Sequence, residues 1–332
     1  MKILDFSSNQ FDELNPDVIW EKNILRFLED WDSSDEYITT QTSGSTGVPK
    51  KIKIPKEAMR KSAKLTGGFF QFQKGQSALL CLPTHFIAGK MMLVRALEFQ
   101  LRLICVEPSS FVDLKTKSLF DFVAMTPMQV QSSLKILPQI KNLLIGGAPL
   151  SSKLKDQLLL SQTNCYESYG MTETVTHIAL KEISEYHFTA LQGVVLSQDS
   201  RECLVIQTPY FKDKVVTNDV VELFDENRFK WLGRFDNVVN SGGIKLFPEQ
   251  IESKLKPYIE CEFIIDSVLD DLLGEQLIIV IESLENNIDF TQLFSKVLSK
   301  YERPKKAYFL DLFPRTENGK VKRKEILNRI KP

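Results

Sequence analysis

The sequence predicts an α/β protein: a large N-terminal domain of mostly parallel βαβ layers plus an antiparallel β subdomain, followed by a small α+β C-terminal lid. From about residue 37 to 170, short apolar runs such as "SALLCLP" and "LRLICVE" alternate with helical patterns such as "GKMMLVRALEF". This alternation is typical of βαβ units and a mostly parallel sheet. From about residue 174, "VTHIAL", "ECLVIQT", "KVVTNDVVELF" and "RFKWLG" follow one another without helices, which favours an antiparallel sheet or small barrel beside the first layer.

A third pattern begins near residue 237 and predicts a compact α+β module. "FPEQIESKLKPYI", "FTQLFSKVLSKY" and "RKEILNRI" have helical patterns, whereas "CEFIIDSVLD", "EQLIIVIES" and "KKAYFLD" are typical of strands. Roughly one hundred residues suffice for an independent module. We place the boundary in "GRFDN", which divides the chain into a large N-terminal domain, 1–235, and a C-terminal lid, 236–332.

Composition narrows the class of protein and of partner. The 332 residues are 43% hydrophobic and 26% charged, with a formal net charge of −1. Near-neutral charge argues against a protein that coats nucleic acid or lies on a membrane surface. The first residues lack the apolar core of a secretory signal, and no apolar run approaches the ~20 residues that span a bilayer. Five scattered cysteines without a C-x-x-C pair suggest neither a zinc site nor a disulfide framework. We expect a cytoplasmic protein with no nucleic-acid partner and no membrane insertion.

The stretch "TSGSTGVPK", residues 42–50, is a candidate phosphate-binding loop. Gly44 and Gly47 allow backbone N–H groups to approach phosphate oxygens, hydroxyls lie between them, and Lys50 supplies a mobile positive charge. The Walker A pattern is not met, because Val48-Pro49 separates Gly47 from Lys50. A flexible Ser/Gly surface turn is the alternative.

Two further segments carry groups suited to a nucleotide. In "YESYGMTETV", Tyr169 offers an aromatic face to a nucleobase, Thr172 a hydroxyl to a phosphate, and Glu173 a carboxylate to Mg²⁺. In "LIGGAPL", Gly146 and Gly147 at the end of a strand permit close approach of a flat ligand. A polar loop and a simple tight turn are the respective alternatives.

The C-terminal half contributes the remaining candidates. Asp219 in "TNDVVEL" can accept hydrogen bonds from both hydroxyls of a ribose, and Arg234 can donate to ribose or phosphate oxygens. Gly242 and Gly243 mark another close approach of the backbone. A β-turn and a surface ion pair would explain the same residues. In "FPRTENGKVKRKEI", a Thr-Glu-Asn-Gly turn presents Lys320 at its tip.

Taken in order, "TSGSTGVPK", "YGMTE", "TND", "GRFDN" and "RTENGKVKR" resemble the adenylate-forming (AMP-binding) superfamily. That superfamily includes acyl- and aryl-CoA ligases, adenylation domains of peptide synthetases, and luciferases. "YESYGMTETVTHIAL" and "WLGRFDNVVNSGGIKLFPEQIE" look most similar to the o-succinylbenzoate–CoA ligase family of menaquinone biosynthesis. The five motifs extend from residue 42 to 323, so the resemblance covers most of the chain.

The resemblance implies a two-step reaction with ATP, Mg²⁺ and coenzyme A. A carboxylate attacks the α-phosphate of ATP, giving an acyl-AMP and pyrophosphate, and the thiol of coenzyme A then displaces AMP. Lys320 would bridge the carboxylate and the α-phosphate, and the 42–50 loop with Lys50 would hold the β- and γ-phosphates. Thr172 and Glu173 would hold the α-phosphate and Mg²⁺.

The same resemblance implies the nucleoside contacts. Tyr169 with Gly146 and Gly147 would enclose adenine, and Asp219 with Arg234 would hold the ribose. The implied ATP-binding set is Thr42, Ser43, Gly44, Ser45, Thr46, Gly47, Lys50, Gly146, Gly147, Tyr169, Gly170, Thr172, Asp219 and Arg234.

Members of the superfamily rotate the lid between the two steps, and Asp236 matches the hinge position. Gly242 and Gly243 would then line the path of the pantetheine arm of coenzyme A. His85, in "LPTHFIAGK", matches a position that lines the acid pocket. His177 is a second pocket candidate, for which a core role is the alternative.

Departures from the family pattern are also visible. Only 41 residues precede the phosphate loop, where family members carry a long segment, so we expect another surface, such as a homodimer interface, to cover the exposed sheet. Asn218 stands in place of the usual glycine before Asp219, and Asn237 in place of a second aspartate. Two other functions remain open: an adenylating enzyme that loads a carrier protein, and an inactive nucleotide-binding protein.

Overall fold

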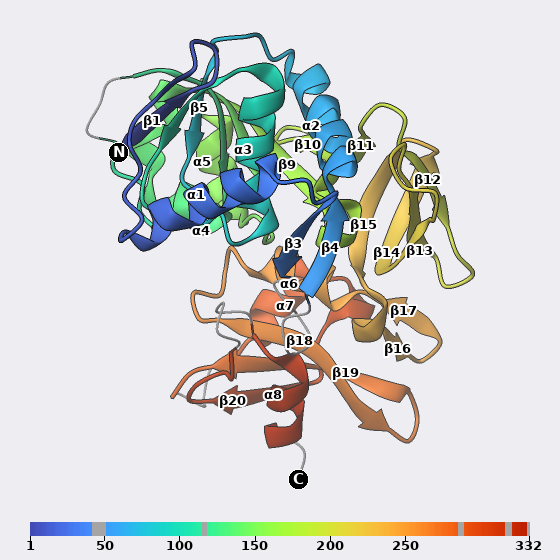
Figure 1. The fold of residues 1–332 in the computed structure, drawn as a ribbon. Helices are drawn as coiled ribbons and strands as arrows, with labels where there is room; N and C mark the ends of the chain where they lie inside the picture. Colours follow the sequence, from blue (N-terminus) through green and yellow to red (C-terminus); the bar gives the residue numbers. More distant parts are fainter. Residues whose placement is uncertain (42–50, 115–117, 285–288, 316–320, 331–332) are drawn as a thin grey trace.

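The computed structural model describes residues 1–41, 51–114, 118–284, 289–315 and 321–330 (Figure 1). The phosphate loop 42–50, with Lys50, and Lys320 lie outside these described residues. The predicted α/β fold is confirmed: a large mixed sheet with helices packed on it, followed by a smaller five-stranded sheet. None of the described helices is long and apolar enough to cross a bilayer.

The parallel part of the large sheet is formed by the predicted βαβ region. Its strands, in spatial order, are β6 (Arg102–Cys105), β5 (Ser77–Leu80), β7 (Phe120–Met125), β8 (Ile140–Ile145) and β9 (Asn164–Gly170). They are nearly continuous apolar runs because both faces of such a sheet are covered. Their carboxyl ends therefore meet along one edge, where α/β proteins bind ligands.

Helices cover this sheet on both sides. α2 (Lys56–Phe70) packs against α3 (Ile87–Phe99), and α5 (Ser152–Leu159) begins at Ser151, whose hydroxyl accepts from the N–H of Leu154. The segment "MQVQSSLKIL" has a helical pattern, but the structure divides it: α4 (Pro127–Ser132) ends at Ser132, and a 3₁₀ helix, Leu134–Gln139, follows. Pro138 lies in that segment and lacks the N–H that an α-helix would need.

The N-terminal residues close one edge of the sheet. β1 (Lys2–Asp5) pairs antiparallel with β6, and β2 (Gln10–Phe11) pairs with β1. α1 (Ile19–Asp32) then buries Ile24, Phe27 and Trp31 against the core. These elements were not among those predicted, because their strands are too short to show a period.

The antiparallel strands continue the large sheet. β10 pairs antiparallel with β9, so the hydrogen-bonded ladder passes from the parallel strands into the antiparallel ones without a break. The separate sheet or barrel suggested by the sequence is therefore wrong. These strands are β10 (His177–Glu182), β11 (Phe188–Ala190), β12 (Val195–Gln198), β13 (Cys203–Gln207), β14 (Val215–Asp225) and β15 (Arg228–Arg234).

The phosphate loop lies between two paired strands. β3 (Tyr37–Gln41) and β4 (Lys51–Pro55) form an antiparallel hairpin whose last pair, Gln41 and Lys51, flanks residues 42–50. This hairpin forms a two-stranded sheet of its own.

The lid has its own sheet and core. Its strands are β16 (Val239–Ser241), β17 (Ile244–Leu246), β18 (Phe263–Asp270), β19 (Gly274–Glu282) and β20 (Lys306–Leu310); its helices are α6 (Pro248–Leu255), α7 (Thr291–Val297) and α8 (Arg323–Ile330). Arg323 on α8 joins Glu252 on α6 through two nitrogen–oxygen contacts of 2.5 and 2.7 Å. The change of sheet falls between Arg234 and Val239, where we placed the boundary. Independent motion of the two domains remains a prediction.

Candidate active site

The structure brings Tyr169, Asp219 and Arg234 together. Asp219 on β14 lies directly opposite Arg234 on β15, and the Arg234 Nη1 is 3.4 Å from the Asp219 Oδ1. Tyr169, near the end of β9, donates its hydroxyl to the Asp219 Oδ2 at 2.6 Å. Three residues predicted from distant motifs therefore form one contact network.

Burial and charge keep the Tyr169 phenol of this network protonated. Asp219 is only 6% exposed, and its carboxylate faces both the phenol and the guanidinium. Burial, followed by the negative charge of Asp219, raises the pKa of Tyr169 well above its ordinary value. The phenol therefore stays a hydrogen-bond donor at neutral pH. Its ring packs edge-on against Phe229, with centroids 5.0 Å apart.

A tight reversal between β9 and β10 carries Thr172 and Glu173. These residues belong to a 3₁₀ turn, Thr172–Thr174, and the following Val175 has φ +66° although it is β-branched and fully buried. Such a conformation costs about 1–3 kcal/mol and persists only where its surroundings enforce it. Here the Thr174 hydroxyl donates to the carbonyl of Thr176 at 2.8 Å and accepts from the N–H of Met171 at 3.0 Å.

Glu173 is exposed at this turn, which suits a shared magnesium site. Among the residues that the structure describes, no three His, Cys, Asp or Glu side chains gather to hold a metal ion. A Mg²⁺ at Glu173 would therefore take its other ligands from phosphate oxygens and water, as Mg²⁺ commonly does.

Packing and backbone conformation explain why glycine occupies positions 146, 147 and 170. A Cβ on Gly146 would lie 2.3 Å from the Ser168 Oγ, so the end of β8 approaches β9 closely. Gly147 is exposed with φ +87°, a conformation that favours glycine. A Cβ on Gly170 would lie 2.4 Å from the backbone of Thr176 and His177. Gly170 thus lets β9 and β10 pair, whatever else it contacts.

The two predicted pocket histidines lie in different surroundings. His85 is exposed before α3, with its ring 4.1 Å from that of Phe86; partial burial, then the charge of Lys90, lowers its pKa. His177 is buried at the start of β10, with its Nε2 3.1 Å from the Thr66 Oγ1. Burial, followed by the charge of Arg95, holds the pKa of His177 well below its ordinary value. His177 is thus a neutral core residue.

Arg95, a buried cation on α3, was not among the predicted site residues. It is 2% exposed, its Nη1 contacts the Met92 sulfur at 3.7 Å, and its guanidinium lies 5.9 Å from the centre of the Phe122 ring. Its Nε and Nη2 have no hydrogen-bond partner within the described residues. Burial lowers its pKa to about 9, so it remains mostly charged at neutral pH. A lone arginine in the apolar run "MMLVRALEF" was the available signal.

The hinge and the lid turn are also described. Asp236 is exposed in the 3₁₀ turn Phe235–Asn237, and its Oδ2 accepts from the Asn218 Nδ2 at 3.3 Å. Gly242 and Gly243 have φ +57° and +79° and form the two-residue turn between β16 and β17. Positive φ at both positions explains why glycine is favoured there.

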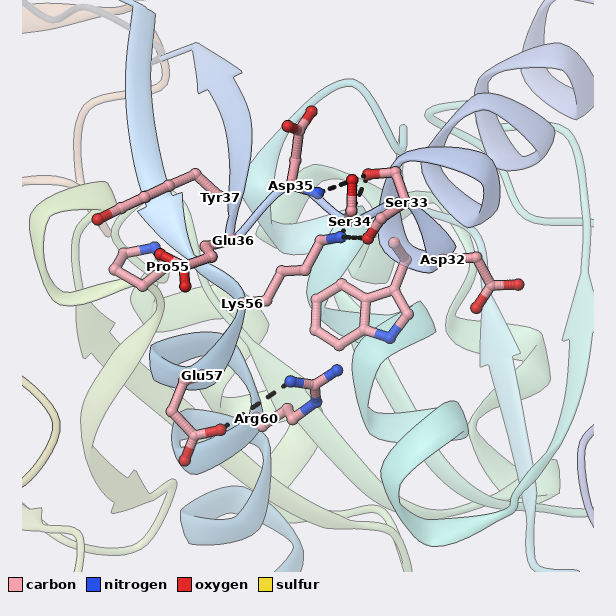
Figure 2. Close-up of a pocket in the computed structure, with 11 residues that line it drawn as sticks. Asp32, Ser33, Ser34, Asp35, Glu36, Tyr37, Pro55, Lys56, Glu57 and Arg60 are labelled. Atoms are coloured by element: carbon pink, nitrogen blue, oxygen red, sulfur yellow. Dashed lines mark hydrogen bonds and ion pairs between the residues drawn. The ribbon is translucent and has the colours of Figure 1, made fainter.

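A polar surface pocket lies elsewhere (Figure 2). It has a volume of about 610 Å³ and is formed where α1 ends and α2 begins. The Lys56 Nζ donates to the carbonyl of Ser33 at 2.8 Å, and the Arg60 guanidinium lies 5.0 Å from the centre of the Trp31 ring. These cations are engaged within the protein, and none of the predicted site residues lines the pocket. We therefore do not assign it as the active site.

Comparison with known proteins adds a family match and curated relatives. The model of the AMP-binding enzyme family matches residues 4–201. A 2-succinylbenzoate–CoA ligase of Haemophilus influenzae is 28% identical over 279 residues, covering 76% of this chain and 60% of the relative. A Bacillus cereus protein of the same name is 24% identical over 329 residues, covering 86% and 68%. The chain thus spans about 60% of the first relative's length and 68% of the second's.

Solved structures give the same picture. An acyl-CoA synthetase (AMP-forming)/AMP-acid ligase II-like protein of Dyadobacter fermentans is 34% identical, with a TM-score of 0.65, and the alignment covers 98% of this chain and 97% of that one. An o-succinylbenzoate coenzyme A synthetase of Bacillus subtilis, in complex with ATP and magnesium, has a TM-score of 0.75 at 19% identity, covering 87% and 69%. This second likeness shows the shared fold.

Removing the Tyr169 hydroxyl from the network should weaken nucleotide binding. Tyr169→Phe keeps the ring but deletes the donor to the buried Asp219 carboxylate, so we expect ATP affinity to fall about three- to tenfold, the worth of roughly one hydrogen bond. Isothermal titration calorimetry measures this. Tyr166→Phe, three residues earlier on the same strand, should bind ATP as the wild type does. Unchanged affinity in Tyr169→Phe would contradict the role of the network.

Proposed function

Because the chain belongs to the AMP-binding enzyme family, we propose that it is an AMP-forming acid–thiol ligase that joins a carboxylic acid to coenzyme A. One observation carries this proposal. Tyr169 and Arg234, which belong to motifs distant in the sequence, both contact the carboxylate of Asp219. The Tyr169 hydroxyl, the Asp219 carboxylate and the Arg234 guanidinium together offer donors and an acceptor to a nucleoside. The turn that follows β9 presents the exposed carboxylate of Glu173, which suits the Mg²⁺ of a magnesium nucleotide. The family match supports the same chemistry.

In the proposed reaction, two anions must meet at phosphorus. The acid's carboxylate oxygen attacks the α-phosphorus of ATP and the bond to pyrophosphate breaks; the thiol sulfur then attacks the acyl carbon and AMP leaves. Positive charge and hydrogen-bond donors lower the barrier to the first step. We assign Lys320 to the carboxylate and α-phosphate, Lys50 with its loop to the departing phosphates, and Thr172 with Glu173 to the α-phosphate and Mg²⁺.

The remaining assignments follow the network. Asp219 and Arg234 would hold the ribose, while Tyr169, Gly146 and Gly147 would border the adenine. Asp236 would act as the hinge, with the turn at 242–243 beside coenzyme A.

We further propose o-succinylbenzoate as the acid and o-succinylbenzoyl-CoA, in menaquinone biosynthesis, as the product. The curated relatives named above support this substrate. An acid with a second carboxylate needs a cation at the far end of its pocket. We propose Arg95 as that cation, because its guanidinium is buried and two of its nitrogens have no hydrogen-bond partner within the described residues. Another aryl or acyl acid remains the alternative substrate, and a carrier-protein thiol the alternative acceptor. Product analysis with coenzyme A alone decides the acceptor.

Lys320→Ala should separate the two half-reactions. We expect acid-dependent pyrophosphate release to be abolished, because the cation that joins the two anions is lost, while thioester formation from supplied acyl-AMP is largely retained. Lys322→Ala, an exposed neighbour paired with Glu325 at 2.8 Å, is the control and should leave both rates unchanged. An equal fall of both rates in Lys320→Ala would show that its role is assigned wrongly.

A panel of aromatic, dicarboxylic and fatty acids, assayed by pyrophosphate release, tests the substrate. We expect o-succinylbenzoate to be preferred, and Arg95→Met to lower its kcat/KM about tenfold to a hundredfold, the worth of a charged hydrogen bond. For the analogue lacking the second carboxylate, Arg95→Met should lower kcat/KM far less. Arg95→Lys should retain part of the activity toward o-succinylbenzoate.

Arg60→Met, which removes a cation already paired with Glu98 at 3.4 Å, is the control for the panel and should leave the preference intact. Equal losses for both acids in Arg95→Met would make Arg95 a structural residue. Preference for an unrelated acid would overturn the substrate while leaving the reaction class standing.

A further inference from the structure

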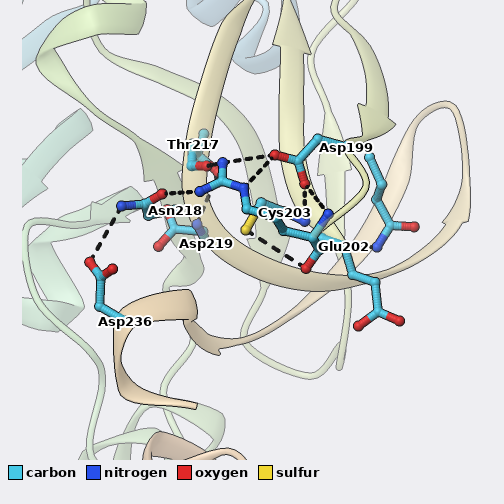
Figure 3. Close-up of polar contacts among 9 residues, drawn as sticks. Asp199, Glu202, Cys203, Thr217, Asn218, Asp219 and Asp236 are labelled. Carbon is cyan, nitrogen blue, oxygen red and sulfur yellow. Dashed lines mark hydrogen bonds and ion pairs between the residues drawn. The ribbon is translucent and has the colours of Figure 1, made fainter.

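Arg201 lies in the turn between β12 and β13 and contacts Phe235, the residue before Asp236. Figure 3 shows Asp199, Asn218 and Asp236, which belong to the same set of polar contacts. The Arg201 Nε donates to the Asp199 Oδ2 at 2.9 Å, and its Nη2 donates to the carbonyl of Thr217 at 3.0 Å. Its guanidinium also lies 5.2 Å from the centre of the Phe235 ring, just before the hinge residue. With its donors directed to fixed acceptors, Arg201 is a rigid support rather than a mobile surface cation.

Asn218 extends this support to the hinge itself. Its Oδ1 accepts from the Arg201 Nη1 at 2.8 Å, and its Nδ2 donates to the Asp236 Oδ2 at 3.3 Å. An amide carries an acceptor and a donor on one carbon, so it can connect a cation to a carboxylate. A glycine at this position could make neither contact.

The position of Asn218 also places it next to the nucleotide network. Successive residues of a strand point to opposite faces, so Asp219 faces Tyr169 and Arg234 while Asn218 faces the hinge. One peptide unit of β14 therefore carries the carboxylate assigned to ribose and the amide that contacts Asp236. A third link joins Glu202 in the same turn to Lys245 on β17, and like the Asn218–Asp236 hydrogen bond it is exposed.

We propose that Asn218 is a positioning residue that holds the lid in the observed orientation through its hydrogen bond to Asp236. This rests on the proposed function, because the two half-reactions need two orientations of the lid. A lid orientation that moves Asp236 away from β14 lacks the Asn218–Asp236 hydrogen bond. The balance between two conformations is set by contacts that differ between them, and this is such a contact. Asn218 thereby sets how readily the enzyme passes from adenylation to thioester formation.

Hydrogen–deuterium exchange of the protein alone tests the contact. In Asn218→Ala, we expect the amides of 235–241 to exchange about three- to tenfold faster, as for the loss of one hydrogen bond. Asn218→Asp keeps an acceptor for Arg201 but places a carboxylate against Asp236. We therefore expect the amides of 235–241 to exchange even faster in Asn218→Asp than in Asn218→Ala. Asn227→Ala, in the turn between β14 and β15, is the control. Exchange equal to the wild type in both Asn218 variants would overturn the proposal.

The half-reactions provide the second measurement. If Asn218 positions the lid, Asn218→Ala should change the rates of pyrophosphate release and of thioester formation from acyl-AMP in opposite directions, with little change in the KM for ATP. A rise in that KM together with equal losses of both rates would mean that Asn218 merely supports Asp219, and would overturn the proposal. Exchange needs no substrate, so absence of any ligase activity would refute the proposed function alone.

Discussion

The reversal of the chain between β9 and β10 is the constraint on which the rest of the large domain depends. β9 is the last of the parallel strands of the large sheet, β10 pairs antiparallel with it, and the two are joined by six residues, 171–176. So short a reversal forces Val175 to φ +66° and requires Gly170, because any Cβ there would overlap the backbone of β10. In return, Thr172 and Glu173 are presented on a rigid turn at the carboxyl edge of the parallel strands, while Tyr169 precedes them on β9. The strain and the candidate chemistry therefore have the same origin.

Asp219 connects this turn to the rest of the chain. A carboxylate that is 6% exposed needs partners, and it has them from two directions, the Tyr169 phenol and the Arg234 guanidinium. The phenol belongs to the parallel half of the sheet and the guanidinium to the last strand before the hinge. The Asp219 carboxylate thus connects three strands: its own strand β14, β9 and β15. Its neighbour Asn218 carries that connection on to Asp236, so the contacts to Tyr169 and to Asp236 both start from β14.

Local patterns predicted much of this arrangement, and tertiary contacts decided the rest. The βαβ alternation predicted the parallel strands because their buried apolar runs are a local property. The continuity of the sheet could not be predicted, since "VTHIAL" has the same pattern whether it pairs with β9 or with a separate sheet. Likewise, motifs indicated Tyr169, Asp219 and Arg234, but only the fold shows that the phenol bonds the carboxylate. His177 illustrates the limit: its neighbours Thr66 and Arg95 lie 111 and 82 positions away in the sequence, so no local pattern could tell pocket from core.

Arg95 raises the sharpest energetic question in the molecule. A buried guanidinium normally has a carboxylate partner, because the cost of removing its charge from water is several kcal/mol. Here the contacts at hand are a thioether sulfur and the face of Phe122, both weak, and burial lowers the pKa of Arg95 to about 9. A methionine or leucine would pack the same site at lower cost, so stability alone does not explain an arginine. A ligand carboxylate would restore the missing pair only while it is bound. The instability of the empty site would then become affinity for a dicarboxylic acid, in keeping with the general observation that proteins break local rules at functional sites.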